Sequence, residues 1–146
     1  MKPLVAAVAV LVALAVGAQA QTPEIDALRT RAAQGDAEAQ FFLGNRYATG
    51  TGVPQNDAVA ARWWRLAADQ GYARAQNNLG AMYSNGQGVV QDYVQAHKWY
   101  NLAAAHLTGS DRNQAVKSRA AVEGKIRPAQ VAEAQKMARE WRQKTQ

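Results

Sequence analysis

The chain has 146 residues, with 17 lysine and arginine residues against 11 aspartate and glutamate residues, and a formal net charge of +6 at pH 7. It has no cysteine, which excludes disulfides and leaves packing alone to stabilise the fold. Without its N-terminal leader-like stretch, the chain has the length of a single domain.

Residues 1–20 have the pattern of a signal peptide. Lys2 gives a positive start, residues 4–16 are an apolar run, and Ala18-Gln19-Ala20 is an A-x-A cleavage site. The apolar run is too short to cross a bilayer as a helix. We expect cleavage after Ala20 and export to the bacterial periplasm, with secretion and an uncleaved membrane anchor as the alternatives.

Residues 21–35 predict an N-terminal capping helix. Ile25, Leu28 and Ala32 recur at i, i+3 and i+7, an amphipathic helical pattern. Residues 32–40, from the end of this segment into the first unit, match residues 68–76 at an offset of 36 residues. We therefore expect the second helix of an incomplete repeat, which covers one end of a stack.

Residues 36–71 and 72–107 are two copies of one unit. Of 35 aligned positions, 15 are identical at the constant offset of 36 residues. A period in this range indicates stacked supersecondary units.

The pattern of apolar residues predicts two helices in each unit. In the first unit their apolar stripes are Ala39, Leu43 and Tyr47, then Ala60, Trp63 and Ala67, with Leu66 beside the second stripe. The first helix ends in a turn at Gly50 and Gly52, and Asn56 or, in the second unit, Asp92 can cap the next helix. Gly44 and Gly80 lie within the first helices, where glycine costs about 1 kcal/mol relative to alanine. We expect both to mark a close approach of the partner helix.

The repeated pattern is A-x-A-Q-x-x-L-G-x-x-Y, then G-x-G-V, then A-x-x-W-[WY]-x-x-A-A. Its first copy is Ala37, Ala39, Gln40, Leu43, Gly44, Tyr47, Gly50, Gly52, Val53, Ala60, Trp63, Ala67 and Ala68, and the second copy lies 36 residues further on. This pattern resembles the Sel-1-like repeat, a relative of the tetratricopeptide repeat. The resemblance implies an all-α fold, an α/α solenoid of helix pairs with capping helices, used for protein–protein contact. The resemblance implies no catalytic centre. Some relatives are cysteine-rich and join each helix pair by a disulfide, and the activities proposed for them are not carried over to this cysteine-free chain.

The sequence predicts a basic C-terminal capping helix pair over residues 108–146. Ser110 or Asp111 would cap a helix that ends near Glu123, and Pro128 would open a second helix that frays after about Arg142. Val131, Ala134, Ala138 and Trp141 form its apolar stripe, and we expect Trp141 to seal the stack.

The positive charge is concentrated in this last segment. Residues 112–146 hold nine lysine and arginine residues against three acidic ones, whereas residues 21–111 hold seven against eight. An anionic envelope component could bind here, but a solvated basic face is the simpler interpretation. Nucleic acid is not expected, because Trp141 is the only aromatic among these basic residues and we expect it to be buried.

No catalytic or metal-binding pattern is present. His97 and His106 are nine residues apart on one predicted helix, outside any metal-ligand spacing, and we expect both to be solvated. The serines lack a G-x-S-x-G context. The sequence therefore predicts no enzyme, no metal and no cofactor.

The candidate binding face follows from elimination. The first helix of each unit carries a second stripe of residues beside the inward-facing one. By resemblance to tetratricopeptide stacks, we expect this second stripe to line the concave face. The candidate partner-binding residues are Glu38, Phe41, Asn45, Arg74, Asn77 and Asn78. Phe41 is either an exposed anchor or packed under the first helix; the asparagines either hold a peptide backbone or are merely hydrated.

The predicted function is an exported, monomeric repeat scaffold that binds a protein or peptide through its concave face. The alternatives are a cell-wall or β-lactam-acting enzyme, and an envelope structural protein held by its basic cap.

Overall fold

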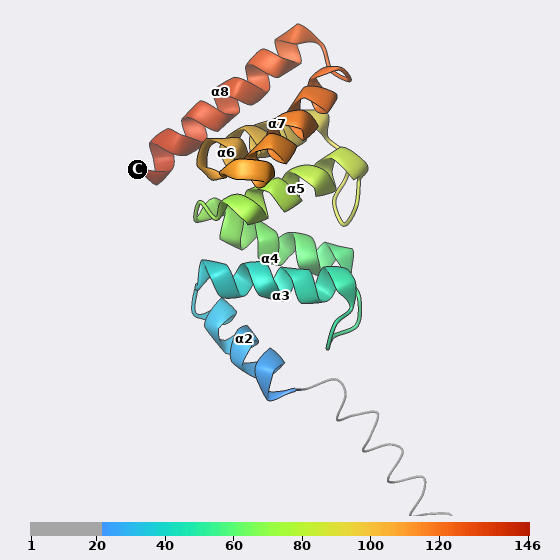
Figure 1. Cartoon of the computed structure of the whole chain (residues 1–146), viewed down its shortest axis with the longest axis vertical. Coiled ribbons are helices and arrows are strands. Elements are labelled where there is room, and N and C mark those ends of the chain that lie inside the picture. Colours follow the sequence, from blue (N-terminus) through green and yellow to red (C-terminus); the bar gives the residue numbers. More distant parts are fainter. Residues whose placement is uncertain (1–21) are drawn as a thin grey trace, which may run out of the picture.

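The computed structural model describes residues 22–146, which form seven helices and no strand (Figure 1). The helices are α2 (Pro23–Ala33), α3 (Ala37–Thr49), α4 (Asp57–Asp69), α5 (Ala73–Asn85), α6 (Tyr93–His106), α7 (Gly109–Glu123) and α8 (Pro128–Thr145). The predicted signal peptide lies outside the described residues.

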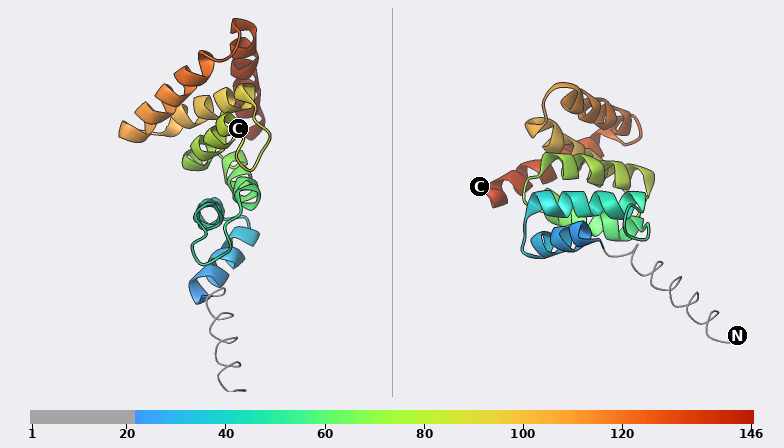
Figure 2. Two further views of the ribbon diagram at one scale, coloured as in Figure 1. Left: turned by 90° about the vertical axis from the view of Figure 1, so that its right-hand side faces the viewer. Right: turned by 60° about the horizontal axis from the view of Figure 1, so that its bottom comes forward.

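The helices stack in chain order. From α2 to α7 each packs against the next in sequence, while α8 returns to pack against α6. Figures 1 and 2 show the resulting elongated stack, with α2 at one end and α7 and α8 at the other. This is the all-α helical solenoid that the repeat pattern predicted.

The helix boundaries have local causes. Asn56 caps α4 by accepting a hydrogen bond from the backbone N–H of Val59 at 3.1 Å, and Asp92 caps α6 in the same way. Gly50 and Gly86 end α3 and α5 in the left-handed conformation, with φ of 71° and 65°. These predicted caps and turns are confirmed.

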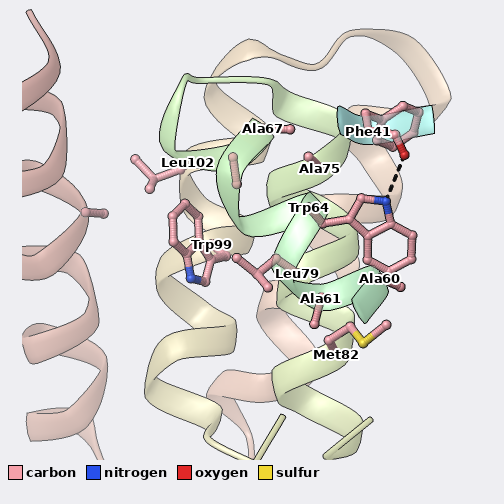
Figure 3. Close-up of a cluster of buried hydrophobic side chains, with 12 residues drawn as sticks. Phe41, Ala60, Ala61, Trp64, Ala67, Ala75, Leu79, Met82, Trp99 and Leu102 are labelled. Atoms are coloured by element: carbon pink, nitrogen blue, oxygen red, sulfur yellow. Dashed lines mark hydrogen bonds between the residues drawn. The ribbon is translucent and has the colours of Figure 1, made fainter. Parts of the chain in front are cut away.

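Gly44 and Gly80 lie beneath aromatic rings. A Cβ atom on Gly44 would be 2.5 Å from the ring of Trp64, and one on Gly80 would be 2.9 Å from the ring of Tyr100. The indole Nε1 of Trp64 donates to the carbonyl of Phe41 at 3.2 Å, which fixes the ring over the glycine (Figure 3). The predicted close approach between the two helices of each unit is confirmed.

Leu66 does not join the core, contrary to its predicted place beside the inward stripe. It is 48% exposed, whereas its counterpart Leu102 is fully buried. The difference arises because Leu102 belongs to a core cluster that Ala138 of α8 completes. The half-buried Trp141 joins this cluster and meets Trp99 edge-on, with ring centroids 6.2 Å apart.

The C-terminal boundaries differ slightly from prediction. Helix α7 begins at Gly109, before the proposed caps Ser110 and Asp111, and Thr108 occupies the N-cap without a side-chain hydrogen bond. Helix α8 runs on to Thr145 instead of fraying at Arg142. An arginine side chain has no acceptor, so the Arg127 cap is completed from within the helix: Gln130 Oε1 accepts from the Arg127 N–H at 3.0 Å.

Candidate functional site

A pocket of about 200 Å³ opens on the side of the stack formed by α3, α5 and α7. It is lined by Phe41, Arg74, Asn77, Asn78, Leu107, Asp111 and Gln114. We call it the α3–α5–α7 pocket. Four of the six candidate residues predicted from sequence, contributed by two repeats, therefore meet at one depression.

Phe41 forms the apolar floor of this pocket rather than an exposed anchor. Its side chain is only 7% exposed, and its ring centroid lies 5.0 Å from that of Tyr72. The neighbouring Phe42 is 42% exposed instead. Of the two interpretations of Phe41, the packed one is right, so its truncation would damage the core as well as any ligand contact.

Polar groups surround this floor. Arg74 and Asp111 form an exposed ion pair at 3.7 Å, which connects α5 with α7. The Oδ1 atom of Asn77 is buried without a hydrogen-bond partner among residues 22–146. Such an unsatisfied acceptor costs about 1–3 kcal/mol, and an incoming N–H donor would satisfy it. Amides beside an aromatic floor suit recognition of an extended peptide backbone.

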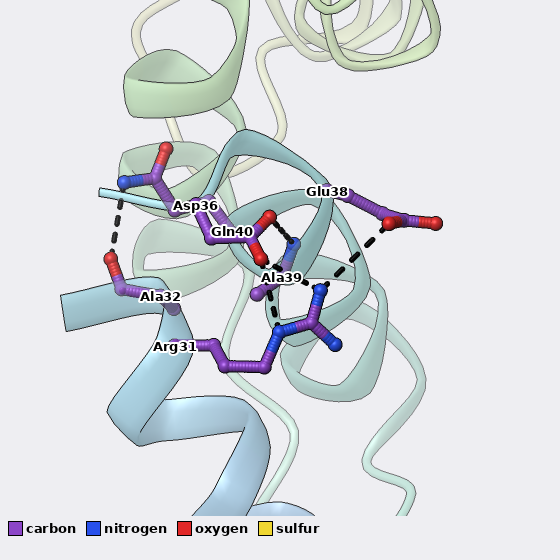
Figure 4. A network of polar contacts seen from close by, with 6 residues as sticks. All are labelled: Arg31, Ala32, Asp36, Glu38, Ala39 and Gln40. Atoms are coloured by element: carbon purple, nitrogen blue, oxygen red, sulfur yellow. Dashed lines mark hydrogen bonds and ion pairs between the residues drawn. The ribbon is translucent and has the colours of Figure 1, made fainter. Parts of the chain in front are cut away.

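Two predicted residues lie outside the pocket. Asn45 accepts a hydrogen bond from Trp64 Nε1 at 3.1 Å, so its amide serves the repeat core. Glu38 lies 3.7 Å from Arg31, in the polar network at the start of α3 (Figure 4). Helical spacing does not show which polar groups the fold already uses.

Comparison with known proteins identifies the repeated unit. The family described as Sel1 repeat matches residues 37–72 and 73–106. The chain carries two Sel1 repeats. Sel1 repeats commonly form scaffolds for protein–protein contact, and this Sel1 repeat protein has the corresponding all-α fold.

Two solved bacterial structures resemble this Sel1 repeat protein. One is a protective antigen of uropathogenic Escherichia coli strains with an SLR fold, at 35% identity and a TM-score of 0.74. The other is a Sel1 repeat protein from Oxalobacter formigenes, at 32% identity and a TM-score of 0.64. Each match covers 80% of this chain, but only 24% and 48% of the respective neighbour. No curated protein matches.

The chain thus spans about a quarter and a half of the lengths of these two neighbours. The pocket residues Leu107, Asp111 and Gln114 lie beyond the Sel1 repeats and were not predicted. Asp111 and Gln114 lie beyond the repeat period, and Leu107 stands where the first unit has Gly71, so the repeat pattern gave no signal for them.

The two histidines of the Sel1 repeat protein differ in environment. His97 is 1% exposed and its Nε2 lies 2.7 Å from Glu123 Oε1, so the prediction of a solvated side chain is wrong. Helix α7 covers this position, which neither repeat alone could indicate. His106 is exposed as predicted. In residues 22–146 no cluster of three acidic, histidine or cysteine residues could hold a metal ion, and no helix is long and apolar enough to cross a membrane.

Proposed function

We propose that this chain is an exported periplasmic scaffold that binds a peptide segment of a partner protein in the α3–α5–α7 pocket. The observation that carries the proposal is the convergence of Asn77, Asn78 and Gln114 on one apolar floor, with the Asn77 acceptor buried and unsatisfied. The Sel1 repeats supply the general precedent of protein contact.

In the proposed complex the amides bond the partner's backbone while an apolar side chain rests on Phe41. The lining residues include no histidine, serine, cysteine or lysine, which supports binding rather than acyl or phosphoryl transfer at this site. The exposed ion pair of Arg74 and Asp111 gives the pocket one group of each charge, so either a basic or an acidic flank of the peptide finds a partner.

The test begins with capture of partners from bacterial envelope extract by the exported protein. Each captured partner is titrated against the wild type and against Asn78→Arg, whose long side chain would lie across a pocket of only about 200 Å³. A matched control changes charge elsewhere, at the exposed α8 residues, with Lys136→Glu/Arg139→Glu.

Binding in the pocket predicts an affinity loss of about tenfold or more for Asn78→Arg, little loss for the α8 double variant, and weak salt dependence. Loss confined to the α8 variant, with strong salt dependence, would overturn this proposal in favour of anchoring through the basic helices. The export step has its own test, because mass spectrometry of the exported protein should give Gln21 as the N-terminus.

A further inference from the structure

A second pocket lies between α4 and the turn that follows α5, away from the lining of the α3–α5–α7 pocket. Its volume is about 510 Å³, and it is lined by Ala58, Ala61, Arg62, Arg65, Leu66, Leu79, Gly88 and Val89. We call it the α4–α5 pocket. The turn packs closely against α4, since a Cβ on Gly88 would lie 2.3 Å from the backbone oxygen of Asp57. Leu66, at its edge, is 48% exposed.

The repeat explains why this space is empty. Ala61 of α4 stands 36 residues after Ile25 of α2, and Gly88 stands 36 residues after Gly52. In the preceding unit, Ile25 is 1% exposed and packs against Gly52, whose added Cβ would lie 3.2 Å from Ile25 Cγ1. Ala61 lacks the branched aliphatic side chain that fills the equivalent place.

The residue that follows Ile25 in the first unit and Ala61 in the second differs in charge between the two units. Asp26 of α2 lies 3.7 Å from Arg29, and Arg29 also donates to the hydroxyl of Tyr47. In the next unit Arg65 likewise donates to the hydroxyl of Tyr83, but Arg62 stands where Asp26 stood. Within residues 22–146 neither Arg62 nor Arg65 is ion-paired with a carboxylate, and the Nε of Arg65 is buried without an acceptor.

We propose that the α4–α5 pocket is a second docking site, for a partner segment that presents a branched aliphatic residue next to an acidic one. The aliphatic side chain takes the place that Ile25 fills in the preceding unit. The carboxylate pairs with Arg65 and with Arg62, which itself stands where the first unit has Asp26. The first unit thus supplies the chemical pattern of the ligand, an aliphatic side chain next to a carboxylate.

The surroundings favour an anion at this edge. Two cations, Arg62 and Arg65, line the pocket, and Arg65 also lies over the ring of Trp99, as does Lys98 of α6. Burial, and next the charge of Arg65, lower the pKa of Lys98, while Asp69 acts in the opposite direction. The carboxylate of Asp57 is held by the amides of Gln55 and Gln87 and does not compete.

The experiment uses the acetylated, amidated peptide Ala-Ile-Asp-Ala and isotope-labelled exported protein, followed by two-dimensional amide NMR. Two control peptides replace the isoleucine by alanine or the aspartate by lysine. At about 1 mM peptide, a range suited to short ligands, we expect shifts in the amides of Ala61, Leu66 and Val89, with weaker or no shifts for the controls.

Two variants restore the first unit's residues. Ala61→Ile should fill the pocket and weaken peptide binding about tenfold or more, with an unchanged or higher Tm. Arg62→Asp, on the exposed surface, should weaken binding and remove much of its salt dependence. The matched controls Ala132→Ile and Arg112→Asp make the same replacements at exposed positions on α8 and α7, and should bind as wild type.

Equal affinity in wild type and Ala61→Ile, or equal shifts with the lysine peptide, would overturn the assignment. So would shifts confined to the α3–α5–α7 pocket, or none at this peptide concentration. If the same amides shift with protein concentration in the absence of peptide, the pocket is an interface between two copies and the proposed ligand is wrong.

Discussion

At the scale of single residues, packing in each Sel1 repeat depends on a glycine beneath an aromatic ring. The Trp64 ring cannot yield easily to a side chain on Gly44, because its indole nitrogen bonds both Phe41 and Asn45. Here the benefit of a close approach between the two helices outweighs the low helix propensity of glycine.

Gly44→Ala is therefore expected to lower the free energy of unfolding, by on the order of 1 kcal/mol, although alanine is the better helix former by about the same amount. Denaturant titration measures the change. Gly124→Ala is the matched control, because Gly124 has φ of −66° and no side-chain neighbour that a Cβ would clash with. That control should be neutral or slightly stabilising, and a Gly44→Ala protein as stable as wild type would refute the contact.

The carboxyl group of Asp36 allows a prediction about how the stability of the fold depends on pH. The backbone N–H of Ala39, and then the Arg31 guanidinium, hold the pKa of the Asp36 carboxyl below its ordinary value. Because the folded-state pKa is the lower one, this carboxyl stabilises the fold above its unfolded-state pKa and loses that effect as pH falls through the folded-state value.

An NMR titration of the carboxyl should give the depressed value directly. Arg31→Ala should raise the pKa part of the way, whereas Arg29→Ala, at a residue that contacts Asp26 and Tyr47, should leave it unchanged. A wild-type pKa at or above the ordinary aspartate range would contradict the role of these two donors.

Residue environments were the least predictable part of the molecule. Helical spacing singled out Phe41 but could not decide whether its ring is exposed or packed; the ring is packed, whereas that of Phe42, 5.4 Å away, is 42% exposed. His97 was expected to be solvated, yet α7 brings Glu123 over it. Both outcomes depend on which neighbouring helix covers the position, and the pattern of one helix does not contain that information.

At the scale of helices, buried glutamines tie each unit to the one before it. Gln40 of α3 donates to the carbonyl of Ala32 on α2, and Gln76 of α5 donates to that of Ala68 on α4, both at 3.1 Å. The two glutamines differ in the number of hydrogen bonds that they make. Gln40 Oε1 also accepts from Gln70 at 2.8 Å, whereas Gln76 Oε1 is buried without a partner in the part of the chain that the structure describes.

Gln40→Leu should therefore cost about 1–3 kcal/mol of unfolding free energy, since it breaks two hydrogen bonds and leaves their partners behind. Gln76→Leu removes one hydrogen bond together with an unsatisfied oxygen, so its cost should be clearly smaller. The two variants serve as each other's control in parallel thermal or denaturant unfolding. A larger loss for Gln76→Leu would show that these hydrogen bonds do not set the strength of the ties.

The helices themselves followed from sequence, because period, caps and glycine turns agree in both copies. Beyond residue 107 the second copy is no longer available as a check, and there the start of α7 and the end of α8 were misjudged. The exposure of Leu66 was missed for a related reason: the two units are alike in sequence, but only α6 is covered by α8.

At the scale of the whole molecule, α8 is the element that closes the stack. Trp99 and Leu102 of α6 are fully buried, in a cluster that Ala138 of α8 completes. A chain that ends at Arg127 would expose this surface. We expect hydrogen exchange in α6 and α7 to accelerate strongly in that variant, with a smaller change in α2 and α3, because stack stability depends on nearest neighbours.

Removal of Thr145 and Gln146 alone is the matched control and should leave exchange unchanged, because both residues are exposed. Uniform acceleration from α2 to α7 in the Arg127 variant would contradict the nearest-neighbour description and show a single cooperative unit.

The return of α8 to α6 also sets the order in which the chain can fold. Most contacts from α2 to α7 join consecutive helices, so this part has low contact order and can form as successive segments become available. Helix α6 is the exception, since its Trp99 and Leu102 face must wait for residues 128–145. During synthesis, that apolar surface is the one left without its cover until α8 has formed, which makes α6 the segment most in need of protection from aggregation.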